Sequence, residues 1–235
     1  MTPVPLVDAR FRSRPNRFVV RATLDDGTGV EAHLADPGRL RDLLLPGAAL
    51  RLLPLPPAAS RRLRYRVALV RTDGEPAIWV SLETTRANAL AEGLLERGRL
   101  RGIGRPHRLR REVRHGSSRF DFRVEHADGK LVWIEVKSVT WVEHGTARFP
   151  DAPTARGRRH LLELQQLTHA GARAMVLFVV QRPDAQRLRP CARIDPGFAA
   201  ALRSARQAGV MLRAAGFGFD PDGRASYLGA VPVRA

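Results

Sequence analysis

The sequence predicts two folded parts, a small β-barrel followed by an α/β domain. Over the first eighty residues, short runs of strand-forming residues alternate with turns rich in Gly, Pro and Asp. After Ser81 the order of patterns changes to helix, three strands, helix and strand. The last of these strands, "RAMVLFVV", is apolar throughout, which is typical of a strand covered on both faces. We therefore place the two domains at 1–81 and 82–235.

The first part contains five runs with strand character, and "DDGTG" separates the first two as a turn. Several short strands with turns between them are typical of a small barrel. The segment "LADPGRLRDLLLPGA" predicts a loop with a short helical turn between strands. The expected strands are 17–24, 30–34, 48–53, 64–71 and 77–81.

The second part opens with a helix, because Thr84 or Thr85 can cap it, apolar residues recur at helical spacing and Gly98 ends it. A second helix carries Leu161, Leu164 and Leu167 on one side. The remaining elements follow from the same patterns. We expect strands at 108–115, 119–125, 131–136, 173–180 and 210–214, and helices at 84–98, 154–170 and 198–208.

Charge and composition limit the possible partners. The chain has 40 Lys plus Arg against 23 Asp plus Glu, a formal charge of +17, which favours a polyanionic partner such as nucleic acid or an anionic membrane surface. A genome rich in G and C would also inflate the arginine content. With 44% hydrophobic residues, the chain is not expected to be disordered.

The sequence predicts a cytoplasmic protein without a membrane segment. Cys191 is the single cysteine, so neither an intrachain disulfide nor a cysteine-based zinc site can form. The N-terminus has no basic segment followed by an apolar stretch, and arginine and prolines interrupt the apolar run "LLLPGAALRLLPLPPAA".

One lysine stands out against the composition. Only Lys130 and Lys137 are lysines, so arginine is the default cation of this chain. Lys137 follows Glu135 by two residues in an apolar strand, and side chains two apart in a strand point to the same face. A lysine at this position therefore indicates a functional site that requires an ammonium group and at which an arginine guanidinium could not replace it.

Asp121 can join this pair across a hairpin. A three-residue loop made of Asp128, Gly129 and Lys130 would place Asp121 opposite Lys137 and diagonal to Glu135, on the same sheet face. Gly129 would then occupy the left-handed conformation. A two-residue loop would instead put Asp121 on the other face. The first alternative is the one we predict.

Two carboxylates and an ammonium on one face suit phosphodiester hydrolysis with Mg²⁺ or Mn²⁺. Asp121 and Glu135 are hard oxygen ligands, and Lys137 can donate to the attacking water or to the phosphate. The alternative is an ordinary strand face in which Asp121 pairs with Arg119 or Arg123.

Other side chains are candidates for nucleic-acid contacts. In the barrel these are Arg17, Arg39 and Arg41, and on the second helix they are Arg156, Arg159 and His160, which with Glu163 fall three or four residues apart. Solvated surface is the alternative for each arginine. Trp133, Trp141 and Phe149 could stack on bases, although core packing is favoured for Trp133.

The segments "RFDFRV", "WIEVKSVTW", "FPDAPTARGRRHLLEL" and "HLADPGRLRDLLLPGA" resemble the sugar fermentation stimulation protein A family over nearly the whole chain. The resemblance implies an N-terminal barrel of the oligonucleotide-binding (OB) kind and a C-terminal domain of the PD-(D/E)XK nuclease superfamily. It implies Asp121, Glu135 and Lys137 as the nuclease triad, with Glu112 of "REVRHG" as an additional acid. The usual Cys-Pro-Asn-Thr-Gly segment is replaced here by Leu-Ala-Asp-Pro-Gly at 34–38.

The resemblance also implies DNA binding without marked sequence preference. The predicted function is therefore a DNA-binding protein with a Mg²⁺-dependent nuclease site. Two alternatives stay open: a non-catalytic DNA-binding regulator of sugar (maltose) metabolism genes on the same fold, and an RNA-directed nuclease. Charge does not separate the three, because each needs a basic surface.

Overall fold

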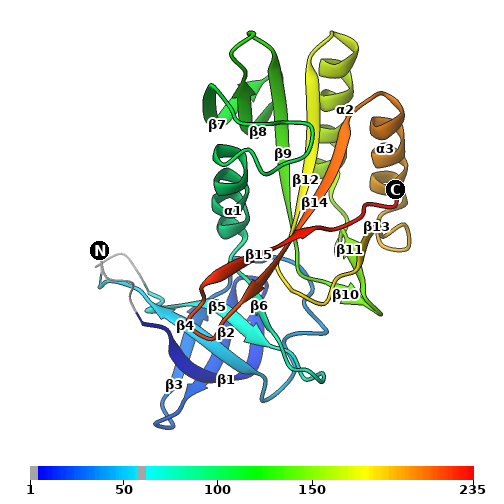
Figure 1. Cartoon of the computed structure of the whole chain (residues 1–235). Helices are drawn as coiled ribbons and strands as arrows, with labels where there is room; N and C mark the ends of the chain where they lie inside the picture. Colours follow the sequence, from blue (N-terminus) through cyan, green and yellow to red (C-terminus); the bar gives the residue numbers. More distant parts are fainter. Residues whose placement is uncertain (1–4, 58–61) are drawn as a thin grey trace. The chain divides into compact units, whose positions relative to one another are not determined.

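The computed structural model describes residues 5–57 and 62–235 (Figure 1). The chain divides into two compact units. The first unit comprises the residues up to Thr85 together with Gln181–Asp184 and Gly216–Leu228, and the second comprises Arg86–Val180, Ala185–Ala215 and Gly229–Ala235. Residues 82–85, 181–184 and 216–228 thus group with the barrel rather than with the rest of 82–235.

The first unit contains a closed five-stranded barrel. Five strands pair in the cyclic order β1-β2-β3-β5-β4, because β3 pairs in parallel with β5, and β6 adds to β5. This closure is that of an OB domain and confirms the predicted fold class of the N-terminal part. The strands are β1 (Val7–Asn16), β2 (Val19–Leu24), β3 (Gly29–His33), β4 (Ala49–Pro54), β5 (Tyr65–Arg71) and β6 (Trp79–Ser81).

The first barrel strand, β1, is not among the strands expected from the sequence. In β1 the inward positions Ala9 and Phe11 are 2% and 5% exposed, while the positions between them are polar. Because one inward residue is only an alanine and Arg and Ser occupy the outward face, the alternation is weak in the sequence. The strand exists because it pairs with both β2 and β4.

The helix, three-strand, helix, strand order predicted for the C-terminal part is confirmed, and with it the PD-(D/E)XK nuclease-like fold. A mixed sheet runs in the order β15-β14-β12-β9-β8-β7, with β12 parallel to β9 (Figure 1). The elements are α1 (Thr84–Glu96), β7 (Arg108–His115), β8 (Ser118–Glu125), β9 (Leu131–Val139), α2 (Ala155–His169), β12 (Arg173–Val180), α3 (Pro196–Gln207), β14 (Met211–Phe219) and β15 (Ala225–Ala230).

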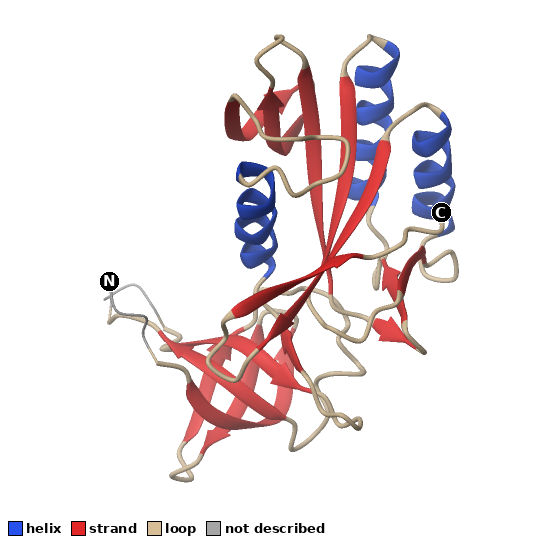
Figure 2. Ribbon diagram, viewed as in Figure 1, coloured by secondary structure: helices blue, strands red, loops and turns tan. Residues whose placement is uncertain are grey.

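Helices α2 and α3 lie side by side and supply much of the core of the second unit (Figure 2). Thr154 caps α2 by accepting the Gly157 N–H at 3.0 Å, and Asp195 caps α3 by accepting the Phe198 N–H at 2.8 Å. The residues of β12 after Arg173 are all buried, as its continuous apolar run predicted. These contacts fix α2 against the sheet, and α2 is one of the elements from which the candidate site is built.

Several short strands had no clear signal in the sequence. Three of them form a separate small sheet in the order β10-β11-β13, with bounds β10 (Val142–Glu143), β11 (Thr146–Phe149) and β13 (Arg187–Pro190). The strand expected at 210–214 is longer, and β15 joins it. Within the described residues, no helix has both the length and the apolar character needed to cross a membrane.

Candidate active site

The hairpin of β8 and β9 sets the position of Asp121. Its ladder pairs Glu125 with Leu131 and ends with Phe122 opposite Ile134. The His126 N–H donates to the Lys130 carbonyl at 3.0 Å, so the loop between them is 127–129. One further step along this ladder places Asp121 opposite Glu135.

The expected register was therefore wrong, although the expected face was right. The loop begins one residue earlier than the predicted 128–130, so Asp121 lies opposite Glu135 and not opposite Lys137. The reason is Gly129, which has φ +78° and is the last loop residue. In three-residue loops the left-handed residue follows the type I turn, which ends the loop at Gly129. The predicted positive φ of Gly129 is confirmed.

The pairing of β8 and β9 ends next to Asp121, and there the side chain of Asp121, instead of a backbone carbonyl, accepts a hydrogen bond from β9. Its Oδ2 accepts the backbone N–H of Val136 at 2.7 Å. Its Oδ1 accepts the side-chain amide of Asn88, on α1, at 2.8 Å. The carboxylate is therefore held by a strand on one side and a helix on the other, with a defined orientation.

Glu135 and Lys137 contact each other, as their spacing in β9 predicted. The Nζ of Lys137 lies 2.6 Å from Oε1 of Glu135, and the two side chains are 14% and 6% exposed. The same Oε1 lies 2.6 Å from Nδ1 of His160 on α2. The other oxygen of Glu135, Oε2, is buried and has no hydrogen-bond partner in the described part of the chain.

The two carboxyl groups have opposite pKa shifts. Burial, followed by the negative charge of Glu135, raises the pKa of Asp121 to about 6. Burial also acts to raise the pKa of Glu135, but the charge of Lys137 and the contact with His160 outweigh it. The pKa of Glu135 therefore lies below its ordinary value. The carboxylates of Asp121 and Glu135 therefore bring negative charge together in a largely covered place, and a bound cation would stabilise that charge.

These donors fit a hexacoordinate hard cation that keeps much of its water. Mg²⁺ is usually held by one or two carboxylates plus substrate phosphates, and Asp121 and Glu135 supply two carboxylates, one with an unpartnered buried oxygen. Within residues 5–57 and 62–235, no three His, Cys, Asp or Glu side chains are grouped so that they could hold a metal by themselves. The donor set is therefore open and does not resemble a closed structural metal site.

Glu112 is the additional acid that the resemblance implied, and it lies on β7. In the register between β7 and β8, its position falls between the pairs Arg111–Phe122 and Val113–Phe120, next to Asp121 of β8. Its backbone has φ +52°, which is unusual for a residue with a Cβ. Its carboxylate binds Arg119 at 2.7 Å and is 46% exposed. In this structure Glu112 is paired with Arg119 and does not join the triad.

The residues predicted on α2 separate into two groups. Arg156 and Arg159 are exposed. The expectation that His160 lines a nucleic-acid groove is wrong for this structure, because its side chain is 1% exposed. Its Nε2 accepts from Arg156 at 3.4 Å while Nδ1 faces Glu135, and its ring packs edge-on against Phe120. His160 therefore orients Glu135.

The three barrel arginines predicted to contact nucleic acid are all exposed. Arg14 connects two of their segments, since its guanidinium donates to the carbonyls of Arg17 and Arg39 at 2.8 and 3.1 Å. Arg17 lies 5.6 Å from the ring centroid of Phe18, a side chain that is 48% exposed. Arg41 lies in the same loop as Arg39. These residues form one basic region of the barrel.

The three aromatic candidates for base stacking differ in burial. Trp133 is 7% exposed and packs against Phe120, as favoured from the sequence. Phe149 is half-buried and packs edge-on against Phe178 and Phe198. Trp141 is half-buried, with the Arg193 guanidinium 5.1 Å from its ring centroid.

Sequence reasoning missed Asn88. It lies on α1, between the buried Ala87 and Ala91, and it donates to Asp121. An amide among small apolar residues of an amphipathic helix was the available signal, but only the tertiary structure shows which acid it reaches.

The comparisons agree with this architecture. The SfsA N-terminal OB domain matches residues 13–82, and the sugar fermentation stimulation protein RE domain matches residues 85–223. A sugar fermentation stimulation protein homolog of Moorella thermoacetica is 45% identical over 220 residues, covering 93% of each chain. A homolog of Symbiobacterium thermophilum is 40% identical and covers 98% of this chain and 97% of the relative.

A solved structure, described as Pyrococcus furiosus SfsA in complex with Ca²⁺, is 30% identical to this chain with a TM-score of 0.86. The alignment covers 100% of this chain and 98% of that one. The fold and the strand-borne carboxylates define the class, an OB barrel joined to a PD-(D/E)XK nuclease-like domain. Within that class, the chain belongs to the sugar fermentation stimulation protein family.

Proposed function

We propose that this protein binds DNA without marked sequence preference and cleaves its phosphodiester bonds with Mg²⁺ or Mn²⁺ as cofactor. The observation that carries the proposal is the meeting of Asp121, Glu135 and Lys137 where β8 and β9 separate, with the buried Glu135 Oε2 unpartnered. A buried acceptor without a partner is costly, and a bound cation would satisfy this oxygen.

Each side chain has a distinct role in the proposed reaction. Asp121 and Glu135 would hold the cation through carboxylate oxygens. Lys137 stands beside Glu135, where its ammonium can donate to the attacking water or to a phosphate oxygen. Asn88 and His160 keep the two carboxylates oriented from α1 and α2.

A divalent cation is a reasonable ligand for these groups. When bound, Mg²⁺ activates a water molecule and neutralises charge that develops on the phosphoryl oxygens. The relative from Pyrococcus furiosus is described in complex with Ca²⁺, which prefers oxygen ligands as Mg²⁺ does. Burial and, after it, the charge of Glu135 raise the pKa of Asp121, and uptake of a cation would offset both effects.

The DNA-binding part of the proposal rests on charge and on exposed arginines in both units. The formal charge is +17, and Arg17 and Arg41 of the barrel and Arg159 of α2 are exposed. Exposed guanidiniums on an OB barrel can neutralise backbone phosphates. This contact supplies affinity without reading base sequence.

The test is cleavage of labelled single- and double-stranded DNA and of RNA, in Mg²⁺, in Mn²⁺ and in chelator. Lys137→Ala should bind DNA like the parent but lose about 100-fold or more in single-turnover cleavage, because one positioned catalytic group is removed. Lys137→Arg should fail as well, since a planar guanidinium does not reproduce the ammonium. Lys130→Ala is the matched control, because Lys130 is exposed and pairs only with Asp128 in the hairpin turn.

The outcomes separate the alternatives. Cleavage that persists in chelator, or that is equal in Lys137→Ala and Lys130→Ala, contradicts the proposed chemistry. DNA binding without any cleavage in either metal favours the non-catalytic regulator of sugar metabolism. Cleavage of RNA but not of DNA identifies the RNA-directed nuclease.

A further inference from the structure

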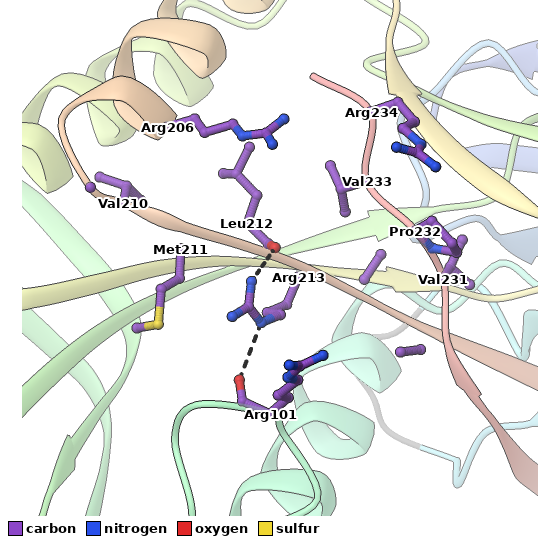
Figure 3. A pocket seen from close by; sticks show the side chains of 13 residues that line it. Arg101, Arg206, Val210, Met211, Leu212, Arg213, Val231, Pro232, Val233 and Arg234 are labelled. Atoms are coloured by element: carbon purple, nitrogen blue, oxygen red, sulfur yellow. Dashed lines mark hydrogen bonds between the residues drawn. The ribbon is translucent and has the colours of Figure 1, made fainter.

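A groove of about 650 Å³ in the second unit lies apart from the triad and has no role in the proposed cleavage. It is formed by the start of β14, the end of α3, the loop after α1 and the C-terminal tail (Figure 3). Its volume lies in the range of protein sites that bind ligands.

Positive charge is concentrated around this groove without a counter-charge. Arg101, Arg206, Arg213 and Arg234 line it, and no Asp or Glu does (Figure 3). Within the described residues, the guanidiniums of Arg101, Arg206 and Arg234 have no ion pair and no hydrogen bond. Arg213 donates only to the carbonyls of Leu212 and Arg101, at 2.9 and 3.2 Å. Four like charges around one concavity favour an anionic ligand.

The floor of the groove is aliphatic and includes a strand edge. Leu212 and Val231 are each 9% exposed, and Val210 is 2% exposed. The last bond from the end of β15 to β14 runs from the Val231 N–H to the Ala214 carbonyl at 2.9 Å.

After Val231 the tail leaves β14 and pairs elsewhere. The Leu188 N–H donates to the Pro232 carbonyl, and the Arg234 N–H donates to the Leu188 carbonyl, at 2.8 and 2.9 Å. On that side, the described part of the chain therefore supplies no strand beside 211–213. An edge strand flanked by a groove can accept an extended segment, and here an N–H of that segment would take the place of the Arg213 guanidinium at the Leu212 carbonyl.

The arginines lie on both faces of this edge. Side chains alternate along β14, so Arg213 points to the face opposite Leu212. In Figure 3, Arg101 and Arg213 lie on one side of the strand, and Arg206 and Arg234 on the other. An added strand would place its own side chains alternately on these two sides.

We propose that this groove binds an extended acidic segment of another protein, which adds as a strand beside Met211–Arg213. Its acidic side chains would meet guanidiniums on both faces, and its apolar side chains would cover Val210 and Leu212. A strand of nucleic acid fits less well, because the lining contains no aromatic side chain on which bases could stack. A single phosphate would engage only one face.

The probe is a fluorescein-labelled peptide, Glu-Glu-Val-Val-Glu-Glu-Val-Val, whose consecutive pairs place acids on both faces of an extended strand. Fluorescence anisotropy with the full chain should give saturable binding. Arg206→Glu and Arg234→Glu should each raise Kd by about tenfold or more, because a like charge then faces the peptide acids. A peptide N-methylated at its central residues should also bind less well, since main-chain donors are lost.

The matched control is Arg203→Glu, an exposed arginine of α3 outside the groove that changes the net charge by the same amount. It should change Kd by less than about twofold, whereas non-specific attraction to a basic protein would weaken equally in both variants.

Equal effects of Arg203→Glu and Arg206→Glu, or no binding of the peptide, overturn the proposal. It is also overturned if a labelled oligo-dT displaces the peptide and binds in an Arg206-dependent way, or if Arg206→Glu halves the mass of the protein in solution. The last result would identify a second copy of this chain as the occupant. The Lys137 variants leave this groove unchanged, so the assay stays independent of the proposed nuclease activity.

Discussion

Replacing Asp121 by Asn should stabilise the metal-free protein while removing its ability to hold a cation. The carboxylate of Asp121 is half-buried beside Glu135, and its pKa is raised from 3.8 to about 6. A rise of about two units corresponds to about 3 kcal/mol of unfavourable free energy for the charged form at neutral pH. An asparagine carries no charge and avoids this cost.

The hydrogen bonds of Asp121 can survive the substitution. The Asn oxygen can accept the Val136 N–H, and if the Asn88 amide turns over, its oxygen can accept from the new NH₂ group. The gain should therefore approach about 3 kcal/mol, reduced by whatever the exchanged bonds lose.

The pH dependence gives a second signature of the same effect. Because the folded-state pKa of Asp121 lies above the unfolded value, the folded parent binds more protons between those two values. Its stabilising contribution is complete below about pH 4 and is lost as the pH rises through about 6. The difference in free energy of unfolding between Asp121→Asn and the parent should grow over this window and level off above it.

Urea denaturation in chelator from pH 4 to pH 8 measures this difference. Glu96→Gln is the control, because Glu96 is exposed on α1 and should show no such trend. If Asp121→Asn is less stable than the parent at pH 7 in chelator, the carboxylate is a net structural contact and the reasoning fails. Adding Ca²⁺ should stabilise the parent but not the variant, since only a bound ligand shifts the unfolding equilibrium.

Three further predictions concern neighbouring features. His160→Ala should weaken Ca²⁺ binding in calorimetry by about tenfold or more, with partial recovery in His160→Gln, because outer partners orient metal ligands; equal affinity in all three proteins contradicts an orienting role. Arg41→Gln should lower the salt dependence of DNA binding, reducing the log–log slope by about 0.9 for one lost phosphate contact; an unchanged slope removes Arg41 from the interface. Thr154→Ala should destabilise the protein by about 1 kcal/mol in urea, because the cap of α2 on Gly157 is lost, whereas Thr154→Ser should retain it.

The sequence alone determined the type and order of the main elements and three residues of the candidate site. Glu135 and Lys137 share a face because strand side chains alternate, and this required only their spacing. The lysine was conspicuous because arginine is otherwise the cation of this chain. Helix α2 followed from its helical periodicity, and the buried strand β12 followed from its continuous apolar run.

Tertiary structure decided what depended on pairing between segments distant in sequence. Strand β1 exists through its bonds to β2 and β4, although its own pattern is weak. Register depended on the place of the left-handed Gly129 within the loop: the loop lies one residue earlier than expected, which moves the partner of Asp121 by two residues, from Lys137 to Glu135.

Packing between distant elements also explains why the positions of His160 and Asn88 were not predicted from the sequence. Helical spacing places His160 on the same side of α2 as two arginines, which favours an exposed position. Spacing alone does not show which side of the helix packs against the sheet. Packing of α2 against the sheet buried it and brought Nδ1 to 2.6 Å from Glu135. Packing likewise brought Asn88 to Asp121. Local periodicity is encoded within a few residues, whereas the partner of a buried polar group is set only when distant elements pack together.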